Sequence, residues 1–347
     1  MRKKEEIMMK KVCAMLLALV LSLSLAACGG AGNSSAADPT GEKLTFPKGA
    51  IQLYCPFKAG GGTDLIARVL VEYINKTYNT NIVVVNQTDG GGAVCYNTVK
   101  NAKADGHVLL YSHSSMFGTY LAGGHDVDPA KDYEYINGSS ISGGYYLDVP
   151  ANSPFKTVTD LVDYCKAHPG EVTLGVQAGS MSNYIIAEFA ANAGIEFKYV
   201  ETGSGDADRV AGLLGNMFQV SLVNAAQTTS YVESGDLRCL CCLSENGNVT
   251  GVLADVPELD QFGMKKGEVG TLCFVALPLG CDEATKAAFS AAFKAAYEDA
   301  GVKEQLHNIN MDMNPCVTGD DAAAAVVENY NLYHSLAADF GLLAPGR

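Results

Sequence analysis

The chain has 347 residues, of which 48% are hydrophobic, and its formal net charge at pH 7 is −14. This length and composition suffice for a globular protein with a full hydrophobic core, and they favour two domains over one. The acidic excess argues against nucleic acids and anionic lipid surfaces as partners. An anionic ligand would need local hydrogen-bond donors, because the long-range field of the protein repels it.

The first 27 residues have the anatomy of a secretory signal peptide. A segment with five Lys and Arg side chains precedes an apolar run over residues 12–27, which is shorter than the roughly 20 residues of a membrane-spanning helix. The run ends in LAAC at 25–28, which resembles the lipobox of bacterial lipoproteins. This pattern predicts an extracytoplasmic protein that is anchored to the cell membrane by a lipid on Cys28. An ordinary secretory cleavage site with an incidental cysteine is the alternative.

Residues 28–43 are rich in Gly, Ser, Ala and Asn and show no apolar periodicity, which predicts a flexible tether and a folded part that begins near Leu44. Loss of residues 1–27 removes five basic and two acidic side chains, and this changes the net charge from −14 to −17.

The segment that follows alternates between strand and helix patterns. Short apolar runs at 51–55 and 82–85 are typical of strands that are buried on both faces of a parallel sheet, and Gly106 precedes a third strand expected at 107–112. Between the first two runs, apolar residues recur at helical spacing from Leu65 to Ile74, and Asp64 is expected to supply favourable charge to the first helical turn. Arg68 and Glu72 are expected to form a surface ion pair and nothing more.

A second α/β block begins after Pro150 and Pro154, and Thr157 is expected to cap its first helix. Its later helices are expected at 182–193 and 207–214, and its strands at 172–176, 197–200, 218–223 and 237–243. From residue 271 one strand leads into helices at 283–300, 302–307 and 320–338, as expected if the chain returns to the first domain. The prediction is an α/β protein with one domain at 44–145 and 271–347, another at 146–270, and a ligand cleft at the strand carboxyl ends.

Four Gly-rich or Ser-rich turns join a strand to a helix, at 59–63, 89–92, 177–183 and 202–206. A helix start leaves backbone N–H groups without intrahelical partners and carries partial positive charge, and glycine lets a ligand approach the backbone closely. One helix end contributes only about 0.3–1 kcal/mol to an exposed anion, so a useful site combines ends from both domains. The first and third turns are predicted to bind a carboxylate together. Each turn taken alone is also consistent with a tight connection.

Catalytic and metal motifs are missing from the sequence. No Walker loop, no GxGxxG with a following acid in the first strand–turn–helix, no GxSxG and no HExxH is present, and the six histidines are scattered. Nine cysteines remain besides Cys13 and Cys28, an odd number that argues against a complete disulfide framework. Cys239, Cys241 and Cys242 are expected to pack in a buried strand, with a disulfide or a metal site as alternatives. Neither a metal nor a cofactor is expected.

The motifs, in their order and spacing, resemble the extracytoplasmic solute receptors of tripartite tricarboxylate transporters, often called Bug receptors. The resemblance covers roughly Leu44 to the C-terminus. It rests on PFKAGGGTDLIARVL (56–70), IVVVNQTDGGGAV (82–94), ADGHVLLYS (104–112), HPGEVTLG (168–175), AGSMSNYIIAEF (178–189), GDLRCLCC (235–242) and DVPELDQFG (255–263). It implies a type II periplasmic-binding-protein fold, whose two α/β domains close on a solute. By this resemblance the turns at 57–64 and 179–183 hold a carboxylate through backbone N–H groups.

The ligand-binding residues predicted on this basis lie in the turns and at the adjoining strand ends. They are Phe57, Ala59, Gly60, Gly61, Gly62, Thr63, Asp64, Ser112, His113, Gln177, Gly179, Ser180, Met181, Ser182, Asn183, Gly203, Ser204 and Asn224. The chain departs from the family pattern at 200–202, which reads VET in place of Pro-Tyr-Lys, and at Asn183, where a histidine is frequent. Val223 and Asn224 stand where an acid often faces an amino group, which favours a solute without ammonium.

The leading prediction is a monomeric, lipid-anchored receptor that closes over a small organic carboxylate, such as a di- or tricarboxylate. The resemblance implies that it delivers this solute to a permease with one large and one small membrane subunit. An exported α/β enzyme for a carboxylated metabolite, with His113 or Asp64 as nucleophile or base, is the first alternative. An orphan sensor for a membrane kinase is the second.

Overall fold

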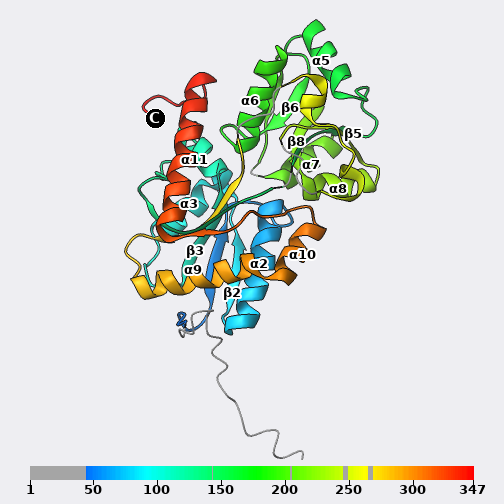
Figure 1. Ribbon diagram of the computed structural model, residues 1–347. Helices are drawn as coiled ribbons and strands as arrows, with labels where there is room; N and C mark the ends of the chain where they lie inside the picture. The colour runs from blue at the N-terminus through cyan, green and yellow to red at the C-terminus, as the bar shows by residue number, and fades with distance from the viewer. Residues whose placement is uncertain (1–43, 143, 204, 245–248, 265–268) are drawn as a thin grey trace, which may run out of the picture. The chain divides into compact units, whose positions relative to one another are not determined.

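The computed structural model describes residues 44–347 except 143, 204, 245–248 and 265–268 (Figure 1). The predicted signal peptide, the tether, Cys28 and the predicted ligand residue Ser204 therefore lie outside the described residues. Among the helices that are described, none combines the length and the apolar character that a membrane span requires.

One sheet has six strands in the order β11-β4-β10-β3-β1-β2. Its parallel part consists of β1 (Ile51–Cys55), β2 (Ile82–Asn86) and β3 (Val108–His113). The strand β10 (Leu272–Pro278) pairs antiparallel with both β3 and β4 (Tyr133–Ser140), and the short β11 (Val317–Thr318) pairs antiparallel with β4. The return of residues 271–347 to the first sheet is as the sequence predicted.

Alternate residues of β3 point to opposite faces of this sheet, because side chains in a strand alternate. Leu109 and Tyr111 pack in a core that includes buried residues of α2 and α9, whereas Leu110 packs in a second core with Phe117 and Tyr333. The helices are α2 (Gly62–Tyr78), α3 (Ala93–Lys100), α4 (Ser115–Leu121), α9 (Glu283–Glu298), α10 (Ala300–Asn308) and α11 (Gly319–Asp339), with the 3-10 turn η1 (Asp89–Gly92).

The other sheet has five strands in the order β7-β6-β8-β5-β9. Its strands are β5 (Tyr145–Pro150), β6 (Thr173–Val176), β7 (Lys198–Glu201), β8 (Val220–Asn224) and β9 (Leu237–Cys242). Its helices are α5 (Val158–Ala167), α6 (Met181–Ala193), α7 (Asp206–Leu214) and α8 (Ala225–Glu233), and the 3-10 turns η2 (Gly251–Leu253) and η3 (Leu259–Phe262) follow β9. Thr157 caps α5 in a capping box with Asp160, as predicted.

None of the nine cysteines of the described chain forms a disulfide with another of them, and seven of the nine are buried. Cys239, Cys241 and Cys242 lie in β9, the strand that the sequence predicted for them. Burial raises the pKa of the Cys55 thiol to about 12, so this sulfur stays protonated at neutral pH.

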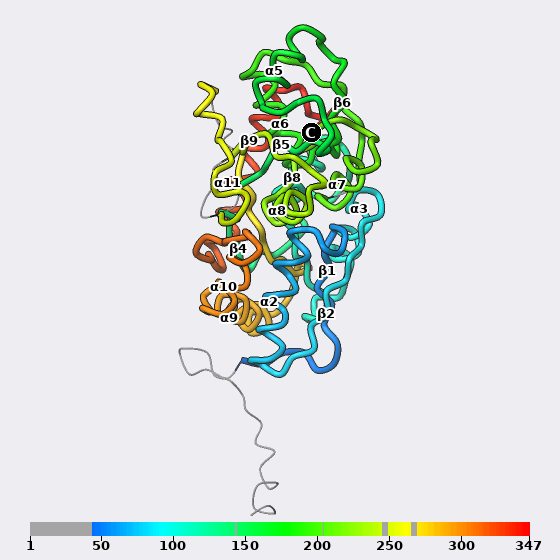
Figure 2. Tube along the Cα trace, turned by 90° about the vertical axis from the view of Figure 1, so that its right-hand side faces the viewer, coloured from blue at the N-terminus to red at the C-terminus, as the bar shows by residue number. Residues whose placement is uncertain are grey.

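The six-stranded sheet with its helices is called lobe 1, and the five-stranded sheet with its helices is called lobe 2. The chain crosses between them after β4 and again before β10. Ile141 N donates to Thr271 O over 2.9 Å, which places the two crossings side by side. In Figure 2, α8 of lobe 2 lies next to the turn that precedes α2 of lobe 1, and Gln227 of α8 donates to the Gly60 carbonyl there.

Candidate functional site

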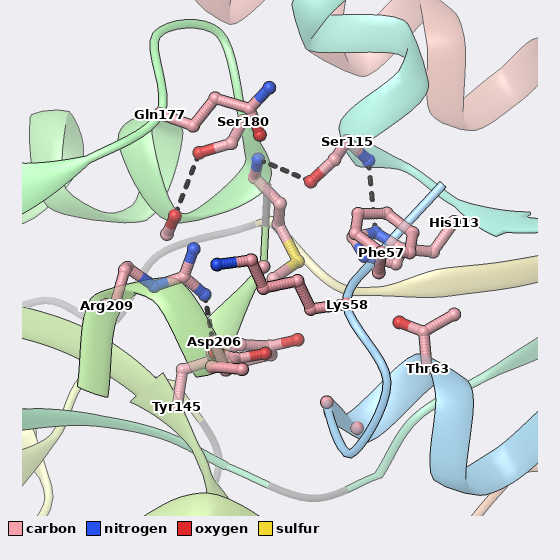
Figure 3. A pocket seen from close by; sticks show the side chains of 16 residues that line it. Phe57, Lys58, Thr63, His113, Ser115, Tyr145, Gln177, Ser180, Asp206 and Arg209 are labelled. Carbon is pink, nitrogen blue, oxygen red and sulfur yellow. Dashed lines mark hydrogen bonds and ion pairs between the residues drawn. The ribbon is translucent and has the colours of Figure 1, made fainter. Parts of the chain in front are cut away.

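A small pocket lies between the two lobes, near the carboxyl ends of β1, β3 and β6 (Figure 3). Its walls are Phe57, Lys58, Gly61, Gly62, Thr63, His113, Ser115, Tyr145, Gln177, Ser180, Met181, Ser182, Gly205, Asp206, Ala207 and Arg209. The cavity volume is about 20 Å³, which leaves room for little more than one water molecule. The lobes are therefore closed in this structure.

Three helices of eight or more residues begin at this pocket. No side-chain cap accepts a hydrogen bond at the start of α2 or of α7 within the described chain, and Gly62, Thr63, Asp206 and Ala207 from their first turns line the pocket. First-turn N–H groups have no intrahelical acceptor, and the helix dipole adds partial positive charge at the same end. The pocket therefore attracts an anion from the walls of both lobes.

The start of α6 is more fully satisfied by its own surroundings. Ser115 Oγ of lobe 1 accepts from Met181 N over 3.0 Å, Ser180 Oγ accepts from Asn183 N over 3.4 Å, and Ser180 Oγ lies 2.8 Å from Ser182 Oγ. The two serine hydroxyls and the start of α6 form one wall of the pocket (Figure 3).

Asp64 fixes the glycine turn from behind. Its carboxylate accepts from Gly60 N, Asn86 Nδ2 and Arg68 Nε, each over 2.9 Å, and the side chain is almost wholly buried. The predicted Arg68–Glu72 ion pair is wrong, because Arg68 pairs with Asp64 one turn earlier. Asp64 thus positions the turn from outside the pocket wall.

His113 is a neutral ring in the wall of the pocket. It stacks on Phe57, with ring centroids 4.4 Å apart, and Ser115 N donates to His113 Nδ1 over 3.2 Å. Burial lowers the pKa of His113 to about 4, and the nearby Arg209 guanidinium acts in the same direction, whereas Asp206 opposes it. Because Nδ1 accepts a hydrogen bond, the proton of the neutral ring resides on Nε2.

Arg209 is a buried cation at the opposite wall. Its Nε donates to Leu222 O over 2.6 Å, and its Nη2 forms an ion pair with Asp206. The Asp206 carboxylate also accepts from Asn224 N over 3.1 Å and from Asn224 Nδ2 over 2.7 Å. Asn224 in turn caps α8 by accepting from Gln227 N.

Polar contacts between the lobes surround the pocket. Lys58 pairs with Asp208 of α7, Gln177 Nε2 donates to Gly91 O over 3.1 Å, and Gln227 Nε2 donates to Gly60 O. Together with the Ser115 and Met181 contact, they connect each glycine turn of lobe 1 to a helix or turn of lobe 2. Opening the lobes breaks all four contacts.

A family model described as tripartite tricarboxylate transporter family receptor matches residues 66–331. The chain belongs to this family. It is 30% identical over 245 residues to the protein BugT of Bordetella pertussis, which covers 69% of this chain and 73% of BugT. Two solved structures have the same fold. One is Rpa4515 of R. palustris with adipate, with a TM-score of 0.76, 21% identity, and coverage of 86% of this chain and 99% of that one. The other is MatC of Rhodopseudomonas palustris with bound malate, with a TM-score of 0.71, 20% identity, and coverage of 84% and 99%.

These findings confirm the predicted fold of two α/β domains of the periplasmic-binding-protein type. They also confirm the predicted class of extracytoplasmic solute receptor. Among the described residues, no three His, Cys, Asp or Glu side chains are grouped so that they could hold a metal ion.

About half of the residues predicted to bind the solute of this receptor lie in the pocket wall. They are Phe57, Gly61, Gly62, Thr63, His113, Gln177, Ser180, Met181 and Ser182. They come from the first and third glycine turns and from the end of β3, which the structure brings together from both lobes.

The other predicted residues that are described lie outside the wall: Ala59, Gly60, Asp64, Ser112, Gly179, Asn183, Gly203 and Asn224. Ser112 is fully buried beside Tyr96. Gly179 N already donates to Asn183 Oδ1 over 3.0 Å, and Asn183 N donates to Ser180 Oγ. Backbone N–H groups at 179–183 were predicted to bind the carboxylate, but those of residues 179, 180, 181 and 183 already have acceptors in the protein. Within the described chain, the N–H group of Ser182 is the one that remains available.

The prediction missed Lys58, Ser115, Tyr145, Gly205, Asp206, Ala207 and Arg209, which all line the receptor's pocket. The glycine-rich turn before α7 was an available signal for Asp206 and Ala207, because it feeds a helix start like the other turns. Tyr145 begins β5 directly after a crossing, and its sequence context carries no comparable signal.

Proposed function

We propose that this receptor binds a small organic carboxylate by closure of its two lobes and delivers it to a tripartite tricarboxylate-type permease. One observation carries the proposal. The starts of α2 and α7, which lack side-chain caps within the described chain, face one pocket from opposite lobes. A carboxylate that accepts several backbone N–H bonds there gains attraction that an acidic protein does not offer at long range.

The solved structures with the same fold support the ligand class. Rpa4515 holds adipate and MatC holds malate, and both ligands are dicarboxylates. For the present receptor we infer a di- or tricarboxylate or a related organic acid.

Hinge motion is the working step of the proposed cycle. A cavity of about 20 Å³ cannot admit an organic acid, so the lobes separate before the solute enters. The contacts between lobes that close the pocket, such as Gln177 with Gly91 and Gln227 with Gly60, then re-form around the bound solute. We place the hinge at the two crossings and keep the predicted domain limits, 44–145 with 271–347 and 146–270.

Catalysis is not part of the proposal. His113 accepts from Ser115 N and stacks on Phe57, and no carboxylate of the described chain is hydrogen-bonded to its ring. The Asp64 carboxylate already accepts three hydrogen bonds behind the glycine turn. Neither residue has the arrangement of an activated nucleophile or a general base.

We further propose that the receptor is a monomer held at the cell membrane by a lipid on Cys28, and that its partners are one large and one small membrane subunit. Uptake of radiolabelled solute by cells that carry both subunits tests the proposed partnership with these subunits. Uptake that depends on the receptor and on both subunits supports the proposal, whereas a transcriptional response without uptake supports the sensor of a membrane kinase.

Calorimetry with a panel of carboxylates tests ligand binding, followed by mass spectrometry of the recovered solute. Binding of an acid that is recovered intact supports the receptor, and turnover of that acid would overturn it. Gly61→Asp places a negative side chain at the start of α2, and we expect it to abolish binding while the melting temperature stays close to that of the native protein.

Gly61→Ala is the matched control. Gly61 has φ −75°, which alanine adopts, and an added Cβ makes a tight contact of 3.2 Å with Lys58 O, which the alanine and aspartate variants share. Unchanged affinity in Gly61→Asp would remove this turn from the site.

A further inference from the structure

The pocket has two chemically different ends. The start of α2 lies at one end, beside the stacked rings of Phe57 and His113. Arg209 lies at the other end, and in Figure 3 it is on the opposite side of the pocket from Thr63. The end at α2 offers backbone N–H groups, whereas the end at α7 offers the guanidinium group of Arg209 in addition to the N–H groups at the start of its helix.

Arg209 is held rigidly, but its hydrogen-bonding capacity is not used up. A guanidinium has five N–H donors, and the described residues accept from Nε, through Leu222 O, and from Nη2, through Asp206. The side chain is 4% exposed and lines the pocket. A buried guanidinium with unused donors favours an acceptor at that position, and a planar carboxylate matches its geometry.

Asp206 does not cancel this cation for an incoming anion. Its carboxylate accepts from Arg209 and twice from Asn224, and it lies in the first turn of α7. Its negative charge is thus shared among several donors and a helix start. For the same reason Asp206 has little capacity left to accept from an ammonium group of a solute.

Lys58 adds a second, adjustable cation. Its side chain is half exposed, reaches into the pocket between Thr63 and Arg209, and pairs with Asp208 across the lobes (Figure 3). Asp208 itself is not part of the pocket wall. A solute that enters the pocket has to displace the Lys58 side chain, and this ammonium is then close to the far end of the solute.

We propose that Arg209 is a specificity-determining residue that binds a second anionic group of the solute, at the opposite end of the pocket from the first carboxylate. The inference rests on the proposed function, because it presupposes that the receptor binds a carboxylate. It assigns to one side chain the selection of dianionic over monoanionic acids.

Matched solutes test this inference on the native protein. Calorimetry compares the dicarboxylate that binds best among succinate, glutarate and adipate with its monoamide and with the monocarboxylate of equal chain length. The diacid is expected to bind at least tenfold more tightly than either partner. Equal affinity for the diacid and its monoamide would overturn the inference, whereas failure of every carboxylate to bind would count against the proposed function itself.

A double variant, Asp206→Asn with Arg209→Gln, removes both charges and leaves no unpaired buried ion. We expect the preference for the diacid to fall below threefold, because affinity for the diacid falls more than affinity for the monoamide. Persistence of the full preference in a folded double variant would overturn the inference. If the double variant does not fold, the ratio between diacid and monoamide affinity is measured in Arg209→Lys instead. Lysine keeps the charge next to Asp206 but lacks the planar pair of donors, so the ratio is expected to fall.

Arg238→Gln is the matched control. This arginine belongs to the same lobe, where it donates to the carbonyls of Ser153 and Phe155, and it does not line the pocket. We expect the ratio between diacid and monoamide to be native in this variant. A ratio that falls equally in Arg238→Gln and Arg209→Lys would overturn the inference, because it would show a general effect of charge.

Discussion

The rings of Phe57 and His113 stack almost in parallel, with an interplanar angle of 6° and centroids 4.4 Å apart. Phe57 follows β1 and His113 ends β3, and these strands are neighbours in the sheet. The stack therefore attaches the glycine turn after β1 to the adjacent strand end without help from a solute. It also covers the imidazole and contributes to the burial that lowers the pKa of His113 to about 4.

The pKa of His113 predicts how the stability of the receptor depends on pH. Between pH 6.5 and about 4 the unfolded chain binds a proton on this residue that the folded chain does not bind. The stability associated with neutral His113 is therefore complete above pH 6.5 and declines as the pH falls, by about 1.4 kcal/mol per unit. Between pH 7 and pH 4.5, the free energy of unfolding measured in urea should fall by about 2–3 kcal/mol more in the native protein than in His113→Gln.

His125 provides the control for this prediction. It is also buried, its Nε2 lies 3.0 Å from Met116 O, and burial lowers its pKa to about 4, but it is not in the pocket wall. His125→Gln should show a similar change in stability with pH. Only His113→Gln is expected to weaken binding of the solute at pH 7, and equal losses in both variants would contradict the placement of His113 in the site.

Asp148 predicts a change of stability with pH in the opposite direction. It is fully buried in β5, where Thr228 Oγ1 donates to Oδ2 over 2.6 Å, and burial raises the pKa of the carboxyl well above its usual range. Hydrogen bonds from Thr228 and Cys239 lower this pKa, and the Asp206 carboxylate raises it, but burial has the largest effect. The folded chain thus keeps a proton that the unfolded chain loses above pH 4. Native stability falls as the pH rises from 4, by about 1.4 kcal/mol per unit, until the pKa of the folded state is reached.

Asp148→Asn carries no such proton. Its free energy of unfolding should exceed that of the native protein at pH 7, and the gap should be larger at pH 7 than at pH 5. Asp160→Asn is a control of opposite sign, because backbone donors at Lys156 and Thr157 lower the pKa of Asp160. A gap between native protein and Asp148→Asn that does not vary with pH would show that this carboxyl titrates normally.

A methyl group at Gly118 should keep the lobes apart. A Cβ at this position would lie 1.9 Å from Gly179 O and 2.6 Å from a ring carbon of Tyr184, so α4 and the turn before α6 pack too closely for alanine. In isolation, alanine would favour the helix α4. We expect Gly118→Ala to weaken solute binding at least tenfold and to increase the radius of gyration in X-ray scattering.

Gly270→Ala serves as the comparison for Gly118→Ala. It lies next to a crossing between the lobes, and a Cβ there meets nothing within 4 Å. Its affinity and radius of gyration should be native. If Gly118→Ala scatters and binds like Gly270→Ala, the contact between α4 and the turn at Gly179 does not limit closure.

The parts of the receptor that were predictable from sequence are local ones. Strand runs, helix periodicity, the Thr157 cap and the four turns depend on residues that are close in the chain, so they located both sheets and nine of the residues that line the pocket. The return of the chain to lobe 1 was also predictable, because one strand and several helices follow the second block.

The missed residues depend on contacts that no local pattern reveals. Arg209 lies on the amphipathic helix α7, and the residues next to it in the sequence do not indicate that it is buried in contact with Leu222 of β8 and Asp206. The donor role predicted for Gly179 N failed for a similar reason, since Asn183 Oδ1 turns back to accept from it. Which N–H groups remain free for a ligand is decided by side-chain contacts, and several of these come from the other lobe, as with Ser115 and Met181.

Asn310 is predicted to set how firmly the lobes close. It lies between α10 and β11 of lobe 1, yet its Nδ2 donates to Thr229 Oγ1 over 2.9 Å and its Oδ1 accepts from Thr250 N over 3.0 Å, both beyond β8 in lobe 2. Its backbone is left-handed, with φ 53°, so Asn310→Gly removes both hydrogen bonds and keeps the backbone. Two hydrogen bonds at about 0.5–1.5 kcal/mol each predict a loss of affinity of about 5- to 150-fold, seen mainly as faster dissociation in stopped-flow or surface-binding measurements.

Asn216→Gly is the control that distinguishes the loss of the Asn310 hydrogen bonds from an effect of glycine on the backbone. Asn216 follows α7, has the same φ of 53°, and its N donates to Leu213 O within its own lobe. Glycine at both positions increases the freedom of the unfolded chain to a similar extent, so both variants should lose a similar amount of stability. Of these two asparagines, Asn310 is the one whose side chain is hydrogen-bonded across the lobes, so its variant is the one that should release the solute faster. Equal dissociation rates in the two variants would mean that the contacts between lobes that surround the pocket keep the lobes closed, and that Asn310 does not.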